Sequence, residues 1–227
     1  MDLKDQAASH ALTYVHDGMI LGLGTGSTTA HFVDKLGEQL QKGGLRDIVA
    51  VPTSENSATR ARALGIPLTT LADHPRLDLA VDGADEVDPA LNLIKGLGRA
   101  LLREKIVEIH ADCFLVIVDE SKLVTRLGRG PLPVEMVPFN AEAHLRWLNT
   151  LGCQAEQWLE ADGSPVVTDN GNFLALCRFP DGIADPYALA RTLADRPGIV
   201  EHGLFLDMAS AAIVAGTNGI RVLERTS

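Results

Sequence analysis

The chain has 227 residues, of which 46% are hydrophobic, and its formal net charge is -10 at pH 7. This composition supports a sizeable core, in one large domain or in one large and one small domain. It argues against a membrane protein, because no apolar run approaches about 20 residues, and against a nucleic-acid-binding protein, because no basic patch or stripe is present.

The N-terminal stretch and the cysteines indicate the compartment. The stretch MDLKDQAASHALTYV carries acidic residues early and has no apolar run, so it does not resemble a secretory signal. The three cysteines are odd in number and far apart, which indicates neither a disulfide framework nor a zinc site. We therefore expect a cytoplasmic protein.

Helical and strand patterns alternate through the first half of the chain. In chain order we expect a helix at 3–15, a strand at 19–23, a helix at 27–42, a strand at 47–51, a helix from 54 or 55 to 64, strands at 67–71 and 77–81, a helix at 98–111 and a strand at 113–118. Such alternation predicts a parallel sheet covered on both faces, with ligands beyond the carboxyl ends of the strands.

The pattern changes at a segment rich in glycine and proline, GRGPLP at 128–133. After it we expect a strand at 134–137, a helix at 141–151, strands near 154–159, 165–168 and 173–177, a helix at 185–194 and a strand near 199. The tail is strand-rich and is expected to return to the first sheet. We predict an α/β fold, with a Rossmann-like, doubly wound, mostly parallel sheet in 1–128 plus 203–227 and a smaller α+β, ferredoxin-like domain in 129–202.

A glycine-rich turn, GLGTGSTT, follows the first expected strand and opens the next helix. Its GxGxG spacing matches neither the dinucleotide fingerprint nor a P-loop. Free backbone N–H groups, the positive end of the helix and the hydroxyls of Thr25, Ser27 and Thr28 suit a single phosphate monoester. The alternative is a plain strand-to-helix turn in which Ser27 or Thr28 is the N-cap.

An acidic turn, DGADEVD at 82–88, follows the strand expected at 77–81. The EF-hand pattern is absent and no histidine lies nearby, which argues against a metal site. The turn is either an ordinary solvated loop or part of a ligand site. Lys95, which precedes a Gly-Leu-Gly turn, either points back into a cleft or is a surface charge.

Two glutamates lie on the helix expected at 98–111. The expected apolar stripe of this helix consists of Leu102, Ile106 and Ile109. At about 100° per residue, Glu104 and Glu108 lie on the opposite, polar face. The spacing does not choose between them, and a solvated side chain is the default for each.

Taken together, seven segments resemble type A ribose-5-phosphate isomerases over nearly the whole chain. They are GTGST (24–28), PTSENSAT (52–59), DLAVDGADEVD (78–88), LIKGLGRALLREKI (93–106), DESK (119–122), PLPVEMVPF (131–139) and TDNGN (168–172). Each segment alone is weak evidence, but seven in this order are highly specific.

The resemblance implies an aldose–ketose isomerase that interconverts D-ribose 5-phosphate and D-ribulose 5-phosphate in the non-oxidative pentose phosphate pathway. The implied catalytic residues are Glu104, Asp82, Asp85 and Lys95. The implied substrate-binding residues are Thr25, Gly26, Ser27, Thr28, Gly83, Ala84, Gly96, Leu97, Gly98 and Lys122. The family's base is the glutamate of the REK triplet, which selects Glu104 over Glu108.

The chemistry implied by the family is a proton transfer between adjacent carbons. Glu104 would move the proton through an enediolate, and Lys95 would stabilise the negative oxygen. Asp82 and Asp85 would handle hydroxyl protons during ring opening. No metal and no cofactor is expected, because the lysine makes a metal unnecessary.

Several further expectations follow from the resemblance. Lys122 and Lys4 would add charge to the phosphate site, and His31 would be a surface or packing residue. Leu97 would alter the lysine turn if its position needs a positive φ. Residues 129–202 would form a lid that helps to build a homodimer or tetramer.

Two rival functions were weighed against the isomerase. A sugar-phosphate-binding sensor module without catalysis would need a DNA-binding domain, and only 23 residues precede Gly24. An acyl or coenzyme A transferase with a glutamate nucleophile would leave Lys122 without a role. The expected partner is a small sugar phosphate, with neither nucleic acid nor membrane.

Overall fold

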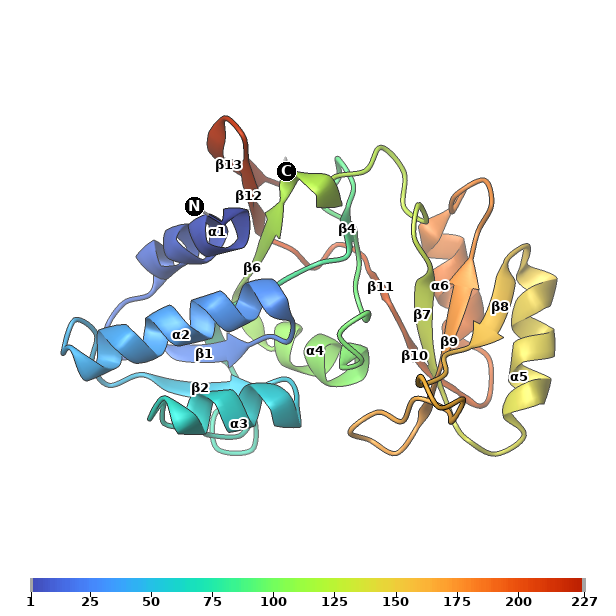
Figure 1. Cartoon of the computed structure of the whole chain (residues 1–227), viewed down its shortest axis with the longest axis horizontal. Coiled ribbons are helices and arrows are strands. Elements are labelled where there is room, and N and C mark those ends of the chain that lie inside the picture. The colour runs from blue at the N-terminus through green and yellow to red at the C-terminus, as the bar shows by residue number, and fades with distance from the viewer. Residues whose placement is uncertain (1, 226–227) are drawn as a thin grey trace. The chain divides into compact units, whose positions relative to one another are not determined.

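The computed structural model describes residues 2–225, which form two compact units (Figure 1). Unit 1 contains the described residues up to Ala84, Arg103–Lys122 and those from Asp207 onward. Unit 2 contains Asp85–Leu102 and Leu123–Leu206. Residues 85–102 therefore pack with unit 2, whereas the division of the chain into a catalytic domain and a lid stays a prediction.

Unit 1 is built on a six-stranded sheet with the order β13-β12-β6-β3-β1-β2. The strands are β1 (Ile20–Leu23), β2 (Val49–Pro52), β3 (Leu77–Asp82), β6 (Ala111–Asp119), β12 (Ala211–Gly216) and β13 (Gly219–Glu224). All neighbouring pairs are parallel except the β12–β13 hairpin. The predicted mostly parallel sheet is confirmed, and the tail returns to it by pairing β12 with β6.

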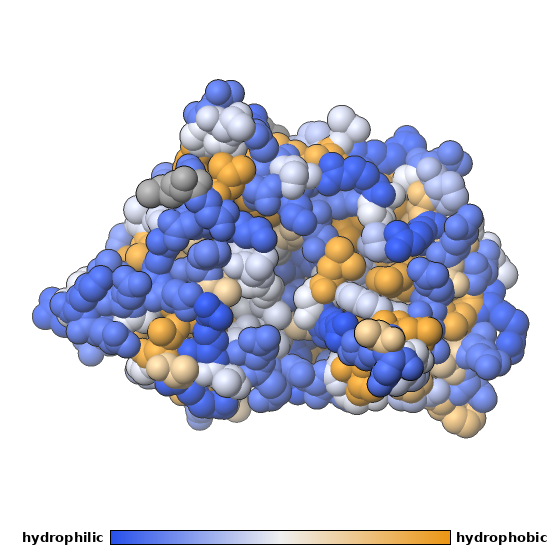
Figure 2. Space-filling model, viewed as in Figure 1, coloured by the Kyte–Doolittle hydropathy of each residue, from blue (hydrophilic) through white to orange (hydrophobic). Residues whose placement is uncertain are grey.

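Helices cover both faces of this sheet. They are α1 (Leu3–Ala11, continued by a 3₁₀ turn at Leu12–Tyr14), α2 (Ser27–Gln41), α3 (Glu55–Ala63) and α4 (Leu101–Glu108). Leu21 and Leu23 of β1 pack in the same core as Phe32 of α2. Gly22 points the other way, where a Cβ would lie 2.9 Å from Cγ1 of Val107 on α4. Most of the outer surface of α2 is hydrophilic (Figure 2).

The strand order places a ligand site in unit 1. The chain winds from β1 outward to β2 on one side, and through β3 and β6 on the other. In doubly wound sheets, ligands bind beyond the carboxyl ends of the strands where the winding direction reverses. That point lies between β1 and β3, which are followed by the glycine turn and the acidic turn respectively.

The larger sheet of unit 2 is antiparallel, with the order β10-β7-β9-β8. The elements are β7 (Leu132–Met136), α5 (Ala141–Leu148, continued by a 3₁₀ turn at Asn149–Leu151), β8 (Gln154–Gln157), β9 (Phe173–Arg178), α6 (Pro186–Ala194) and β10 (Ile199–His202). This βαββαβ order is ferredoxin-like, as predicted. Leu148 of α5 and Leu193 of α6 share one core with β7 and β9.

Two predicted strands are wrong. Residues 165–168 make only isolated bridges, Leu159 to Pro165 and Val167 to Phe173. The strand expected at 67–71 is reduced to a single parallel bridge between Ala50 and Leu68. In both places the backbone makes isolated bridges, and it does not form the consecutive hydrogen-bonded pairs of a strand.

A small sheet in unit 2 was not predicted. Its order is β11-β5-β4, and its strands are β4 (Glu86–Val87), β5 (Leu93–Ile94) and β11 (Leu204–Phe205). Strands of two residues are too short to show any alternation of apolar and polar side chains. The sheet matters because it carries Asp85 and Lys95 at its ends.

A buried carboxylate organises the TDNGN turn. The Glu135 side chain on β7 is fully buried, and its Oε1 accepts hydrogen bonds from Thr168 Oγ1 (2.9 Å), Asn170 Nδ2 (3.1 Å) and Asn172 Nδ2 (2.8 Å). The N–H of Gly171 donates to the carbonyl of Thr168 at 2.9 Å. The motif is therefore a turn wrapped around one acid.

Within residues 2–225, no helix combines the length and the apolar character that a membrane crossing requires.

Candidate active site

The glycine turn after β1 is held by Asp82 at the end of β3. Oδ1 of Asp82 accepts hydrogen bonds from Thr25 N (3.0 Å), Thr29 Oγ1 (2.9 Å) and Gly83 N (2.6 Å). Gly24 makes this possible, because a Cβ at Gly24 would lie 1.9 Å from Cγ of Asp82. The glycine turn and the acidic turn therefore form one structure within unit 1.

Helix α2 begins without a side-chain cap. Its N-cap is Gly26, which has a φ of 129° and makes no capping hydrogen bond through a side chain. The alternative in which Ser27 or Thr28 is the N-cap is wrong. Both residues lie in the first turn of a 15-residue helix, where backbone N–H groups and the helix dipole favour an anion.

Lys4 of α1 lies at this helix start, and it shares the carboxylate of Asp119 with Lys122. Nζ of Lys4 donates to Oγ of Ser27 at 2.9 Å. Burial would raise the pKa of Asp119, but hydrogen bonds from Ser121 and the charges of Lys122 and Lys4 hold it below the usual range. One carboxylate thus interacts with both lysines, which concentrates positive charge near Ser27.

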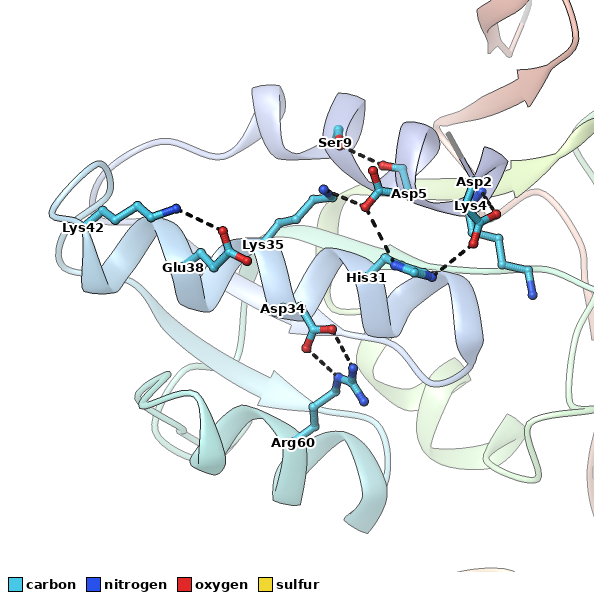
Figure 3. A network of polar contacts seen from close by, with 10 residues as sticks. All are labelled: Asp2, Lys4, Asp5, Ser9, His31, Asp34, Lys35, Glu38, Lys42 and Arg60. Carbon is cyan, nitrogen blue, oxygen red and sulfur yellow. Dashed lines mark hydrogen bonds and ion pairs between the residues drawn. The ribbon is translucent and has the colours of Figure 1, made fainter.

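Helix α1, which carries Lys4, is tied to α2 by ion pairs (Figure 3). Nζ of Lys35 lies 2.7 Å from Oδ1 of Asp5, and this hydrogen bond holds the pKa of Asp5 below its usual range. The His31 ring lies between Asp2 and Asp5, at 3.6 and 3.8 Å. His31, expected to be a surface or packing residue, contacts α1 from a partly exposed position.

Glu86 and Asp88, two of the four acids in the DGADEVD turn, accept hydrogen bonds from loops of unit 2. Glu86 is buried and accepts hydrogen bonds from the backbone N–H groups of Gly128 (2.7 Å) and Gly130. Asp88 accepts from the backbone N–H of Ala90 and of Asn92 at 2.9 and 2.8 Å. These two acids hold loops of unit 2, whereas Asp82 and Asp85 hold the glycine turn and the lysine turn, whose residues the resemblance assigns to the site.

Asp85 and Lys95 are neighbours across the small sheet. In the antiparallel pairing of β4 with β5, Glu86 lies opposite Ile94, so the next pair in this register is Asp85 and Lys95. Lys95 is only 2% exposed, and its ammonium lies 5.3 Å from the ring centroid of Phe205. Lys95 is therefore not a surface charge.

The turn after Lys95 does not require a glycine at position 97. The positive φ values belong to Gly96 (112°) and Arg99 (66°), and Leu97 is not among the described residues with a positive φ. The N–H of Leu97 donates to Oδ2 of Asp85 at 2.9 Å. Leu97 therefore introduces no positive-φ strain into the turn, and the condition under which it would alter the turn is not met.

Arg99 anchors this turn within unit 2, which the sequence did not reveal. Its guanidinium makes a bidentate contact with Glu160, at 2.6 and 3.1 Å, and lies 5.1 Å from the ring centroid of Trp158. Planar pairing of this kind fixes orientation as well as distance. No local pattern links residues so far apart in the chain.

Helix α4 reverses the expected polarity. Glu104 and Glu108 are only 2% and 3% exposed, whereas Ile106 and Ile109 are 42% and 62% exposed. The predicted apolar stripe is wrong, because the buried side of α4 carries carboxylates beside Leu101 and Val107. Burying an acid is costly unless it is paired or hydrogen-bonded, and such groups cluster at functional sites, so these two glutamates are site candidates on structural grounds.

The structure thus brings the predicted residues together in two groups. Within unit 1, the turn of Thr25–Thr28 adjoins Asp82 and Gly83, with Lys122 near its charged end; Glu104 is buried on α4. Within unit 2, Asp85 contacts the turn of Lys95–Gly98. Among residues 2–225, no group of three or more histidine, cysteine, aspartate or glutamate side chains is placed to hold a metal ion.

A doubly wound sheet with an anion-type helix start and a buried acid, Asp82, at its switch point is typical of Rossmann-like enzymes that bind small phosphorylated substrates. The family model of ribose 5-phosphate isomerase A (phosphoriboisomerase A) matches residues 49–219. The chain belongs to this family, and it interconverts ribose 5-phosphate and ribulose 5-phosphate.

Relatives are similar over nearly the whole chain. A ribose-5-phosphate isomerase A of Roseiflexus castenholzii is 54% identical, covering 97% of this chain and 94% of its own. A solved D-ribose-5-phosphate isomerase in complex with phospho-erythronic acid is 45% identical, with a TM-score of 0.96 over 99% of this chain and 100% of its own. The isomerase of Methanocaldococcus jannaschii is 40% identical, with a TM-score of 0.93 over 98% of each chain.

Proposed function

We propose that the reaction is a metal-independent proton transfer in which Glu104 is the base. The observation that carries this proposal is the burial of the Glu104 carboxylate on α4, in the unit that also holds the phosphate-type turn. A carboxylate screened from water takes a proton from one sugar carbon and returns it to the next, through an enediolate.

Lys95 is proposed to stabilise the enediolate oxygens. Its ammonium is buried and its backbone is pinned, because its N–H donates to the carbonyl of Gly203 at 2.9 Å. A cation that is placed before the reaction needs little reorganisation as negative charge develops. Asp82 and Asp85 are proposed to orient the hydroxyls and move their protons during ring opening.

The phosphate is proposed to bind at the start of α2. The ligands would be the backbone N–H groups and hydroxyls of Gly26–Thr28, with Lys4 and Lys122 supplying charge. A relative is solved in complex with phospho-erythronic acid, and the phosphate of that ligand supports a phosphate subsite in this family. Binding energy gained at the phosphate positions the reacting carbons.

The mechanism is tested by isotope exchange. Ribose 5-phosphate is incubated with the protein in D₂O, and both sugars are followed by NMR. Deuterium at C1 of ribulose 5-phosphate or at C2 of ribose 5-phosphate supports proton transfer through a base. Strict retention of hydrogen in both sugars would overturn this route in favour of a hydride shift.

The oligomer and its location are proposed from the family resemblance alone. We propose a cytoplasmic homodimer or tetramer in which residues 129–202 act as the lid and oligomerisation domain. Light scattering coupled to size-exclusion chromatography measures the mass directly. A monomer that is fully active at assay concentration would contradict the proposed assembly.

A further inference from the structure

The turn between β2 and α3 and the first turn of α3 carry three hydroxyls to which the proposed mechanism gives no role. They belong to Thr53, Ser54 and Ser57, which are 1%, 6% and 6% exposed. Buried hydroxyls are kept only where hydrogen bonds compensate for the loss of water. Their partners lie in the glycine turn after β1, some 30 residues earlier in the chain.

The contacts converge on Thr25. Its Oγ1 lies 2.8 Å from Thr53 Oγ1, 2.8 Å from Ser54 Oγ and 3.1 Å from Ser57 Oγ. Ser57 Oγ also donates to the carbonyl of Gly24 at 2.6 Å. The hydroxyl of Thr25 is thus engaged with the β2–α3 turn.

The protons in this cluster have one consistent order. Each hydroxyl has a single proton to donate, and that of Ser57 goes to Gly24. Ser54 therefore donates to Ser57 (3.1 Å) and Thr25 donates to Ser54, which leaves Thr53 to donate to Thr25. The chain of hydrogen bonds begins in the β2–α3 turn, passes through Thr25 and ends at Gly24, and such chains strengthen one another.

The backbone of the turn is consequently held from two sides. Asp82 accepts the N–H of Thr25, while the hydroxyl chain holds the Thr25 side chain and the Gly24 carbonyl. The next residue, Gly26, is the N-cap of α2. Fixing Gly24 and Thr25 therefore fixes the N–H groups at the start of α2.

We propose that Thr53, Ser54 and Ser57 are positioning residues for the phosphate end of the substrate site. They act through Thr25 and Gly24 and touch no substrate themselves. The inference rests on the proposed phosphate site at the start of α2. Pre-organised donors bind an anion more tightly, because no ordering of the loop has to occur on binding.

The first test removes the end of the hydrogen-bond chain with Ser57→Ala. We expect the KM for ribose 5-phosphate to rise about tenfold, as for the loss of one to two hydrogen bonds, with a smaller change in kcat. The inhibition constant of inorganic phosphate, measured as a competitor, should rise in parallel. The matched control is Ser9→Ala, which removes an exposed hydroxyl that donates to Asp5 O on α1.

A second pair of variants separates positioning from folding. Thr25→Val keeps the shape and deletes the hydroxyl, whereas Thr25→Ser keeps the hydroxyl. We expect Thr25→Val to raise both the KM for ribose 5-phosphate and the inhibition constant of inorganic phosphate. Thr25→Ser should keep both constants within about threefold of wild type. A Ser57→Ala protein with altered melting temperature but unchanged KM and phosphate inhibition would overturn the proposal.

A further variant, Lys4→Met, tests the proposed phosphate site independently of the positioning role. Lys4→Met should also raise the KM and the phosphate inhibition constant if phosphate binds beside Ser27. If Lys4→Met has this effect and Ser57→Ala does not, the positioning role alone is refuted. If neither variant has an effect, the proposed phosphate site is refuted with it.

Discussion

Two buried glutamates one helical turn apart distinguish α4 from an ordinary surface helix. Glu104 and Glu108 are almost equally inaccessible, so burial does not tell them apart. The family motif assigns the chemistry to Glu104. The pair therefore offers a matched comparison of two acids on one helix.

We predict that Glu104→Gln folds and binds substrate but loses at least about a hundredfold in kcat, the low end for a positioned general base. Glutamine keeps the shape of the side chain but does not take up the proton. Steady-state assays with ribose 5-phosphate measure the loss. Glu108→Gln is the control, and a larger loss in that variant than in Glu104→Gln would reassign the base.

Gly24 is required by its neighbour rather than by its own backbone angle. We predict that Gly24→Ala destabilises the protein by about 1–3 kcal/mol, because the new Cβ overlaps the Asp82 carboxylate, and that kcat/KM falls. Thermal unfolding and assays measure both effects. Gly43→Ala, where a Cβ would meet no atom within 4 Å, should keep its activity despite a φ of 72°; wild-type activity in Gly24→Ala would contradict the prediction.

The sequence motifs named the candidate site residues, but the sequence did not predict which side chains of α4 point inward. The periodicity of α4 predicted an apolar inner face, because that rule assumes that inward side chains are apolar. A helix that presents acids inward breaks this assumption, and Ile106 and Ile109 are exposed as a result. The roles of Arg99 and Thr53 were missed because their partners are distant in the chain.

At the scale of elements, charged residues gather at the end of β6 and in the 3₁₀ turn Glu120–Lys122 that follows it. Asp119 at the end of β6 interacts with Lys122 and Lys4, which come from different segments of unit 1. The Asp119 carboxylate interacts favourably with the charges of both lysines. Its loss should therefore affect stability as well as phosphate binding.

We predict that Asp119→Asn lowers the free energy of unfolding at pH 7, and that the difference from wild type vanishes in acid. Because the pKa of Asp119 is held below its usual value, its ionised form stabilises the fold above the unfolded pKa of about 3.9. The contribution is lost as the pH falls through the lower folded pKa. Urea titrations between pH 3 and pH 7 measure it, and a constant difference across this range would contradict the prediction.

Long elements were predictable and short ones were not. The 15-residue helix α2 and the nine-residue strand β6 were expected within two residues of their observed ends. Strands β4, β5 and β11 have two residues each, so they carry no periodic signal. The third strand, β11, comes from a distant part of the chain to pair with β5, and no local pattern predicts that pairing.

At the scale of the whole molecule, strand order decides where the chemistry occurs. The motifs after β1 and β3 were visible in the sequence, but their adjacency depends on the pairing of β1 with β3 rather than with other strands. Such pairing is non-local, and no window of sequence encodes it. The family resemblance supplied this information where local patterns did not.

We predict that the enzyme keeps full activity in excess chelator, because the proposed mechanism assigns stabilisation of the enediolate to the buried Lys95 and not to a metal. The measurement is the rate of ribulose 5-phosphate formation after exhaustive treatment with EDTA and dialysis. The control is the untreated enzyme carried through the same dialysis. Loss of activity that an added divalent ion restores would refute the role of Lys95.

The turn around Glu135 affects where asparagine deamidation occurs during storage. Asn-Gly pairs lose ammonia when the glycine nitrogen attacks the asparagine side chain, and they are thermolabile for this reason. At Asn170-Gly171 both reacting groups are held, the amide by Glu135 and the nitrogen by Thr168, whereas Asn218-Gly219 lies exposed at the tip of the β12–β13 hairpin. Deamidation during storage should therefore begin at Asn218 and spare Asn170.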